Sequence, residues 1–325
     1  MFDVSSICEI CKDDHGTHVV AVDFIVPLYK STEHIRDLFE RVNKMSIDFD
    51  ENVNLILVMD GPDENTEKEI GIQKIALKVP LSVLVLSRNF GVGPALLAGL
   101  SESDSCMSMC FGSDLQEPAS VFKTFLEMLT RNEADIALGN RVSREDPFLS
   151  KLGATVYWWI YRRFINSAVP KGGFDIFAMH RHARDTIIEL RELNTSITSQ
   201  IGWIGFRQKY VPFHRQARAS GKSSWTMIRK VKLFTDSIFG FTFIPITVIT
   251  TIGFLSTAFF VTITGLTLIG SIIGLVNVEG YTTLVILVGL GNSVVILSLG
   301  VVGSYISRAF DNSKQRPNFV VMRRF

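Results

Sequence analysis

Two long apolar runs, residues 244–276 and 281–307, lie near the C-terminus, and neither contains Asp, Glu, Lys or Arg. A helix crosses the hydrocarbon core of a bilayer with roughly 20 residues, so each run is long enough to span it. Only residues 277–280 separate the runs, which predicts a helical hairpin that returns the chain to its starting side. Two buried helices of a soluble protein are the alternative, but such helices are rarely this long without charge. The sequence therefore predicts a transmembrane hairpin at residues 244–307.

Charged residues around these runs predict an orientation. Basic residues flank the hairpin on both sides, at Lys222, Arg229, Lys230, Lys232, Arg308, Lys314, Arg316, Arg323 and Arg324. Glu279 is the one charged residue of the connecting sequence. The positive-inside rule therefore places both termini and the polar part of the chain in the cytoplasm. The membrane is then the cell inner (cytoplasmic) membrane. Residues 225–243 mix apolar and basic side chains and predict an amphipathic interfacial helix. Residues 308–325 are expected to form a basic cytoplasmic tail.

The rest of the composition says little about binding partners. The chain has 325 residues and a net charge of +1, which gives no indication of a nucleic-acid partner. Residues 1–18 predict a polar N-terminal extension. Its Cys8, Cys11, His15 and His18 are possible zinc ligands, although the loop between the two pairs is much shorter than in ordinary zinc fingers. A structural zinc and an extension without metal both stay open. Residues 19–224 suffice for one α/β domain with its own core.

Strands and helices alternate within residues 19–139. β-branched and apolar stretches predict strands at residues 19–27, 54–59, 81–86, 106–112 and 134–138. Helical spacing occurs at residues 33–45, and further helices are predicted from Pro94 and from Pro118, since proline suits a first turn. This alternation predicts a mostly parallel sheet covered by helices. Ligands of such sheets bind beyond the carboxyl ends of the strands.

Polar residues gather at those carboxyl ends, namely at Asp60, residues 88–93, Asp114 and Arg141. Asp114 is suited to bind Mg²⁺, which prefers one or two carboxylates together with phosphate oxygens and waters; alternatively it caps the next helix. Asp60 is suited to bind a base or ribose, or it is a plain turn residue before Gly61. The pattern indicates a site for a nucleoside diphosphate.

Six short segments carry a family resemblance. They are FIVPLY at 24–29, MDG at 59–61, SRNFG at 87–91, DLQEP at 114–118, GNR at 139–141 and RASGKSSW at 218–225. The first five resemble, in order, the segments of inverting family-2 glycosyltransferases of GT-A fold. The sixth, followed by the amphipathic stretch and the hairpin, resembles the polyprenyl-phosphate branch, which includes the bactoprenol- and dolichol-phosphate sugar synthases. The resemblance covers nearly the whole chain from about residue 19.

This resemblance implies an enzyme that moves a sugar from a UDP- or GDP-linked nucleotide-sugar to a polyprenyl (undecaprenyl) phosphate, with inversion, for modification of cell-envelope glycans. It implies Mg²⁺ or Mn²⁺ at Asp114, and a homo-oligomer such as a tetramer. The implied donor-binding residues are Pro27, Tyr29, Asp60, Arg88, Asn89 and Gln116. The implied acceptor-phosphate residues are Arg141, Arg218, Lys222 and Ser223. The implied catalytic residues are Asp114, Asp175 and Arg141.

Three positions depart from the family pattern. Met59 stands where the first of two aspartates is common, and Gln116 replaces the second acid of an Asp-x-Asp motif. GGFD at residues 172–175 replaces a Gly-Asp-Phe segment, so Asp175 either acts in catalysis or belongs structurally to a buried strand. Two other functions stay open: a non-catalytic membrane-anchored protein that binds nucleotide-sugar or lipid phosphate as a scaffold, and a polysaccharide synthase. The Gln-x-x-Arg-Trp motif usual in such synthases is absent from the sequence.

Overall fold

The computed structural model of the chain describes residues 21–49, 52–141, 174–190, 196–214, 244–273, 280–314 and 316–325. The chain divides into two compact units. Met1–Lys230 and Pro317–Phe325 form the first unit, and Val231–Arg316 forms the second. The C-terminal residues thus belong to the same unit as the strand-rich part of the chain.

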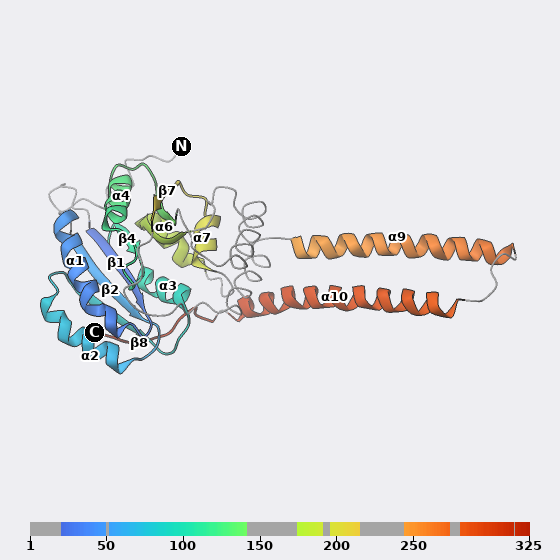
Figure 1. The fold of residues 1–325 in the computed structure, drawn as a ribbon, viewed down its shortest axis with the longest axis horizontal. Coiled ribbons are helices and arrows are strands. Elements are labelled where there is room, and N and C mark those ends of the chain that lie inside the picture. Colours follow the sequence, from blue (N-terminus) through green and yellow to red (C-terminus); the bar gives the residue numbers. More distant parts are fainter. Residues whose placement is uncertain are drawn as a thin grey trace. The chain divides into compact units, whose positions relative to one another are not determined.

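A sheet of eight strands forms the centre of the first unit (Figure 1). The strands are β1 (Ala21–Leu28), β2 (Asn52–Met59), β3 (Leu81–Leu86), β4 (Met107–Cys110), β5 (Ile136–Arg141), β6 (Phe174–His180), β7 (Gln208–Phe213) and β8 (Val321–Arg324). Their order across the sheet is β7-β5-β6-β4-β1-β2-β3-β8. Strands β6 and β8 are antiparallel to their neighbours, whereas β1 to β5 and β7 share one direction. The carboxyl ends of six strands therefore lie at one edge.

Helices cover both faces of the sheet, which gives two hydrophobic clusters. The helices are α1 (Ile35–Phe49, after a 3-10 turn at Thr32–His34), α2 (Glu64–Gln73, followed by a 3-10 turn at Lys74–Ala76), α3 (Val92–Glu102), α4 (Ala119–Thr130), α6 (Arg181–Glu189) and α7 (Ile197–Trp203). One cluster contains residues of α1, α2 and α4, and the other contains residues of α3, α6 and α7. Alternation along β1 assigns Phe24 and Val26 to the first cluster and Ile25 to the second, as the two-residue period of a strand requires.

The five predicted strands are confirmed, with ends that shift by up to three residues. The helix predicted at residues 33–45 begins at Ile35 and continues to Phe49. The helix predicted from Pro94 begins at Val92, and Pro118 is the N-cap of α4, one residue before its start. Strands β6, β7 and β8 were not among the predicted strands.

Strand β8 departs most from the sequence-based expectation, which treats residues 308–325 as a tail. Backbone hydrogen bonds join Val83 and Phe325 in both directions, and the Ser87 amide donates to the Val320 carbonyl at 2.9 Å. Arg323 pairs with Glu67 of α2, and Arg324 pairs with Glu102 of α3 at 3.2 Å. The chain therefore returns after its last helix to close an edge of the sheet.

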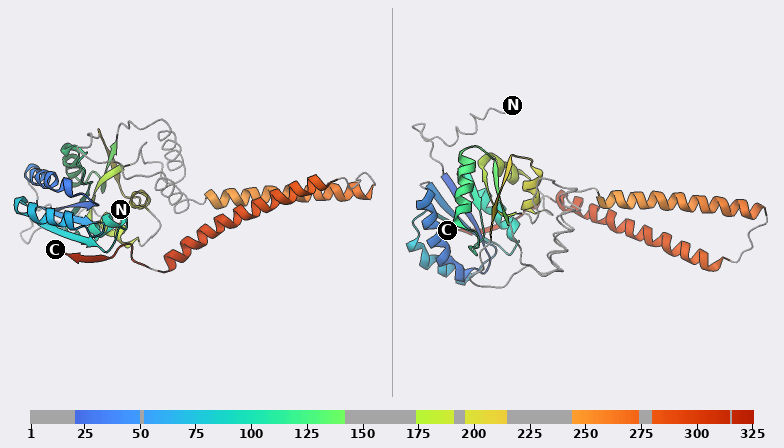
Figure 2. Two further views of the ribbon diagram at one scale, coloured as in Figure 1. Left: turned by 60° about the horizontal axis from the view of Figure 1, so that its bottom comes forward. Right: turned by 45° about the horizontal axis from the view of Figure 1, so that its top comes forward.

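The second unit contains two long helices, α9 (Ile244–Ile272) and α10 (Tyr281–Ser313). They lie alongside each other and run in opposite directions (Figures 1 and 2). Both expose large apolar side chains, among them Phe254 at 74%, Leu266, Leu299 and Ile306. Among the described residues, no helix is long and apolar enough to cross a membrane. The hairpin is present, and its membrane-spanning role stays a prediction.

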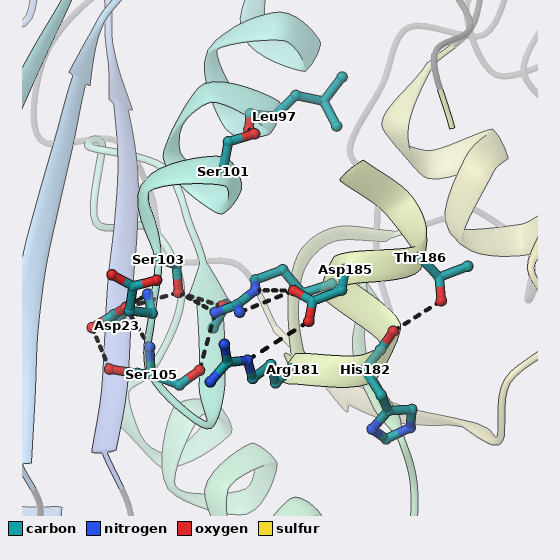
Figure 3. A network of polar contacts seen from close by, with 12 residues as sticks. Asp23, Leu97, Ser101, Ser103, Ser105, Arg181, His182, Asp185 and Thr186 are labelled. Carbon is teal, nitrogen blue, oxygen red and sulfur yellow. Dashed lines mark hydrogen bonds and ion pairs between the residues drawn. The ribbon is translucent and has the colours of Figure 1, made fainter. Parts of the chain in front are cut away.

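A buried polar network lies where β1 begins, at the edge of the sheet opposite the strand ends (Figure 3). The Asp23 carboxylate accepts hydrogen bonds from the hydroxyls of Ser103 at 2.7 Å and Ser105 at 2.6 Å, and from the Asn54 amide at 2.8 Å. Arg184 of α6 donates to the Ser103 hydroxyl and to the Ser105 carbonyl, both at 3.0 Å. The buried carboxylate of Asp23 and the buried guanidinium of Arg184 both need hydrogen-bond partners. The network that results joins β1 and α6 to the loop that follows α3.

Candidate functional site

The residues predicted to bind a ligand lie at one edge of the sheet. Tyr29 follows β1, Asp60 follows β2, Arg88 and Asn89 follow β3, Asp114 follows β4, and Arg141 ends β5. Asp175 lies near the start of antiparallel β6, which places it at the same edge. The side chain of Arg141 is outside the described part of the chain. The predicted convergence at the carboxyl edge is therefore confirmed at the level of the strands.

The Asp60 carboxylate holds the loop that follows β3. Its two oxygens accept hydrogen bonds from the backbone amides of Phe90 at 2.7 Å and Gly91 at 2.9 Å. Asp60 is 5% exposed, and this burial raises the pKa of its carboxyl while the two amides lower it in part. Asp60 is thus more than a turn residue: it fixes the position of the segment that contains Arg88 and Asn89.

Gly61 lets the same two loops approach each other closely. Its φ of +105° is a conformation that residues with a Cβ rarely adopt. A Cβ added there would lie 3.1 Å from the Asn89 nitrogen and 3.2 Å from the Arg88 carbonyl carbon. The loop after β3 is therefore held at three points: by Asp60, by contact with Gly61, and by the bond from Ser87 to Val320 of the C-terminal segment.

We expect Asp60→Asn to weaken donor binding while the protein stays folded. A neutral amide removes the cost of burying a charge, but only one of its two polar atoms can accept a hydrogen bond from a backbone N–H. The loss of one charge-assisted bond should raise the donor KM about tenfold. Asp63→Asn is the matched control, because it removes the same charge nearby and Asn is an equally good N-cap for α2. An unchanged donor KM in Asp60→Asn would contradict this role of the loop.

Asp114 occupies a half-buried turn after β4. The N-cap of α4 is Pro118, with no side-chain capping bond, so the alternative role of Asp114 as a helix cap is wrong. The next residue, Leu115, has φ of +53°, which is uncommon for a residue other than glycine. The guanidinium of Arg41, on α1, donates hydrogen bonds to the carbonyl of Leu115 at 2.9 Å and to the carbonyl of Glu117.

Asp114 is suited to bind a divalent cation as its single protein ligand. Among the residues that the structure describes, no group of three or more His, Cys, Asp or Glu side chains could hold a metal ion. Mg²⁺ is commonly held by one or two carboxylates, with substrate phosphates and waters completing its coordination. A carboxylate at the edge where the strands end matches that mode of binding.

The other predicted donor residues differ in exposure. Tyr29 is exposed, Pro27 is half-buried, and Arg88 and Asn89 are exposed. The guanidinium of Arg88 lies 4.6 Å from the ring centroid of Phe90. Gln116 is only 4% exposed, so its side chain offers a donor little surface. Its predicted role in donor binding stays untested, but the burial favours a role in shaping the loop.

Asp175 is the exposed residue of a strand that is otherwise buried. Asp175 thus belongs to a buried strand but has an exposed side chain, and both its catalytic role and a structural role stay predictions. On the neighbouring strand, Asn140 is half-buried and pairs with Phe174 beyond a register shift. Its Oδ1 is buried and has no hydrogen-bond partner among the described residues.

Several predicted residues lie outside the described part of the chain: Arg218, Lys222 and Ser223 of the acceptor site, and Cys8, Cys11, His15 and His18 of the N-terminal extension. Their roles stay predictions. Conversely, sequence reasoning missed Arg41 and the backbone amides of Phe90 and Gly91. Their hydrogen bonds join residues that are 30 to 76 positions apart, so no local sequence pattern predicts them.

Comparison with known proteins identifies relatives over nearly the full chain. A glycosyltransferase of Synechocystis is 25% identical over 303 residues, which cover 93% of this chain and 95% of the relative. The bactoprenol glucosyl transferase of Shigella phage SfV is 26% identical over 303 residues, covering 92% and 97%. Among solved structures, a mannosyltransferase from Pyrobaculum calidifontis in complex with GDP-Man and Mn²⁺ is similar over 86% of each chain, with 13% identity and a TM-score of 0.45.

The family model described as glycosyl transferase family 2 matches residues 23–189, which is more than half of the chain. That range includes β2 to β6 and all of β1 except its first two residues, and it contains Asp60, Asp114, Arg141 and Asp175. The mostly parallel sheet with helices on both faces is GT-A-like. The chain therefore belongs to glycosyl transferase family 2 and is a glycosyltransferase.

Proposed function

We propose that the protein transfers a sugar from a UDP- or GDP-linked donor to a polyprenyl phosphate, in particular undecaprenyl phosphate. The observation that carries this proposal is the convergence of Asp60, the loop after β3, Asp114 and Asp175 at one edge of a family-2 sheet. Relatives described as bactoprenol glucosyl transferases over almost the whole chain support the lipid acceptor.

The donor half of the site provides binding and charge neutralisation. Asp114 would hold Mg²⁺ or Mn²⁺, which when bound neutralises charge on the departing diphosphate. Residues of the loop after β3, ordered by Asp60, would contact the nucleotide. Gln116 and Glu117 follow Asp114 in the loop after β4, and both are buried.

The acceptor needs little chemical activation, because a phosphate monoester is already anionic at neutral pH. One of its oxygens would bond to the anomeric carbon of the sugar as the bond from that carbon to the diphosphate breaks, with inversion. Catalysis then depends on positioning and on electrostatic stabilisation of the leaving group. Asp175 would orient the acceptor or take a residual proton. Arg141, Arg218, Lys222 and Ser223 would bind its phosphate, since guanidinium groups bind phosphate in a bidentate manner.

We further propose that the α9–α10 hairpin anchors the enzyme in the inner membrane, with the catalytic unit and both termini in the cytoplasm. The uncharged runs and the exposed apolar side chains of both helices support this placement. Strand β8 supports the return of the chain, because residues 321–324 pair with β3 of the catalytic sheet. If α9 crosses the membrane, α10 must cross it back. A homo-oligomer remains part of the proposal, on the family resemblance alone.

The topology makes a direct prediction. A cysteine placed at Asn277 in a background without native cysteines should react with a membrane-impermeant reagent added outside the cytoplasmic membrane. Reporters at Met1 and Phe325 should respond only from the cytoplasm. Labelling of the 277 position exclusively from the cytoplasmic side would show that the hairpin does not span, and the membrane part of the proposal would fail.

The transfer reaction itself is tested with purified full-length protein. Nucleotide-sugars are screened one by one with undecaprenyl phosphate and Mg²⁺ or Mn²⁺, and lipid-linked sugar is measured. Formation of a single-sugar lipid product supports the proposal. Binding of donor without turnover would favour a non-catalytic scaffold, and products that lengthen with time would favour a polysaccharide synthase.

A further inference from the structure

We propose that Arg41 is a positioning residue, which holds the loop after β4 in the conformation that presents Asp114 to the cation and the donor diphosphate. This inference rests on the proposed function, because it assigns the metal to Asp114. It concerns a residue on α1 that lies outside every segment of the family resemblance.

The contacts of Arg41 span the loop. Its Nη1 donates to the Leu115 carbonyl at 2.9 Å, and its Nη2 donates to the Glu117 carbonyl. The guanidinium carbon also lies 5.5 Å from the ring centroid of Phe122, on α4. A single planar group thus joins the residue after Asp114, the end of the loop and the helix that follows. Only an arginine side chain offers such a rigid fork of donors.

The loop needs this support because of the backbone at Leu115. A leucine at φ of +53° is in the left-handed region, which costs free energy because the Cβ comes too close to a carbonyl oxygen. Such a conformation persists only where the surroundings stabilise it. Hydrogen bonds from Arg41 to the carbonyls on both sides of Gln116 provide that stabilisation, one residue from the carboxylate of Asp114.

The electrostatic surroundings agree with this role. Burial lowers the pKa of the Arg41 guanidinium, and the nearby carboxylate of Glu117 raises it in part. Glu117 is buried, so the positive charge beneath the loop has a negative neighbour. The Arg41 guanidinium therefore interacts with the loop after β4 rather than with solvent. Arg36, on the same helix, contrasts with it, because Arg36 is exposed and pairs with exposed Glu40 at 3.1 Å.

The test compares Arg41→Ala and Arg41→Lys with Arg36→Ala as the matched control. Hydrogen exchange of the amides at residues 113–117 reports on the loop without metal or activity, and in Arg41→Ala it should accelerate at least about tenfold relative to Arg36→Ala. The dissociation constant for Mn²⁺ in the presence of nucleoside diphosphate should rise about tenfold. Arg41→Lys should restore part of both properties, because an ammonium can reach one carbonyl but cannot reproduce the fork.

A second substitution separates positioning from general stability. Asparagine adopts the left-handed conformation more readily than leucine. In a Leu115→Asn background, Arg41→Ala should therefore weaken Mn²⁺ binding at least about threefold less than it does in the wild-type background. An equal effect in both backgrounds, or wild-type exchange rates in Arg41→Ala, would overturn the inference. If Arg41→Ala does not fold, the same comparison is made with Arg41→Lys.

The two proposals fail in different ways. If the wild-type protein binds no nucleoside diphosphate with Mn²⁺, the proposed function fails, while exchange of the 113–117 amides still shows whether Arg41 orders the loop. If the wild-type protein binds and turns over its donor, and Arg41→Ala does so equally well, only the positioning role fails.

Discussion

Replacing Asp114 with asparagine should lower sugar transfer by at least about 100-fold, the range for losing one well-placed electrostatic element. Asparagine keeps the size of aspartate and one accepting oxygen but lacks the negative charge that holds a divalent cation. Because Asp114 is half-buried and does not cap α4, we expect the variant to fold. The measurement is the initial rate of lipid-linked sugar formation at saturating donor, repeated over a range of Mn²⁺ concentrations.

Asp104→Asn is the matched control for this experiment. Asp104 is an exposed loop residue that lies at the opposite edge of the sheet, where its backbone amide donates to Asp23. Its substitution should leave the rate and the metal dependence unchanged. Near-wild-type turnover in Asp114→Asn would remove Asp114 from the site. A lost rate that returned fully at high Mn²⁺ would instead show that its role is confined to metal affinity.

Arg218→Ala should lower kcat/KM for the lipid acceptor by about 30- to 1,000-fold. Truncating one partner of a desolvated charge pair costs about 2 to 4 kcal/mol, which corresponds to that range. The basis is the sequence alone: Arg218 lies in the segment that precedes the amphipathic stretch and the first apolar run, where a prenyl-linked phosphate would be bound. Arg218→Lys should rescue the rate only in part, because an ammonium binds phosphate without the bidentate fork.

Donor binding distinguishes this role from a general loss of structure. Calorimetry with nucleoside diphosphate and metal should give an affinity within about threefold of wild type in Arg218→Ala. Arg229→Ala is the matched control, since Arg229 is a basic residue nearby but outside the RASGKSSW segment. An equal loss of kcat/KM for the lipid acceptor in the two variants would indicate that Arg218 belongs to an ordinary basic segment at the membrane. Loss of nucleotide binding with an unchanged acceptor KM would reverse the assignment and leave Arg141 as the acceptor residue.

The architecture at the strand ends was predictable because its signals are local. Each of β1 to β5 is a short, mostly apolar stretch, and the alternation of strands with helices implies parallel pairing. That reasoning placed Asp60, Asp114 and Arg141 at one edge, where the structure has them. Strand β6 was not among the predicted strands, and it pairs antiparallel between β4 and β5. From the sequence, a buried strand at Asp175 is only the alternative to a catalytic role.

The contacts that hold the site were not predictable, because they join distant parts of the chain. Asp60 reaches the amides of Phe90 and Gly91 across 30 and 31 positions, and Arg41 reaches Leu115 across 74. Strand β8 pairs with β3 across more than 200 positions, with the whole hairpin between them. The apolar residues at 319–322 were the only local sign of that strand, and their basic neighbours favoured a tail.

The central claim is that this edge of the sheet transfers sugar to a polyprenyl phosphate, and mass spectrometry of the lipid product tests it most directly. Purified wild-type protein with undecaprenyl phosphate, a nucleotide-sugar and Mn²⁺ should form undecaprenyl phosphate that carries one sugar of inverted anomeric configuration. Asp114→Asn should form at least about 100-fold less of it under the same conditions. Free sugar released by water without lipid product, or equal amounts of lipid product from both proteins, would contradict the account.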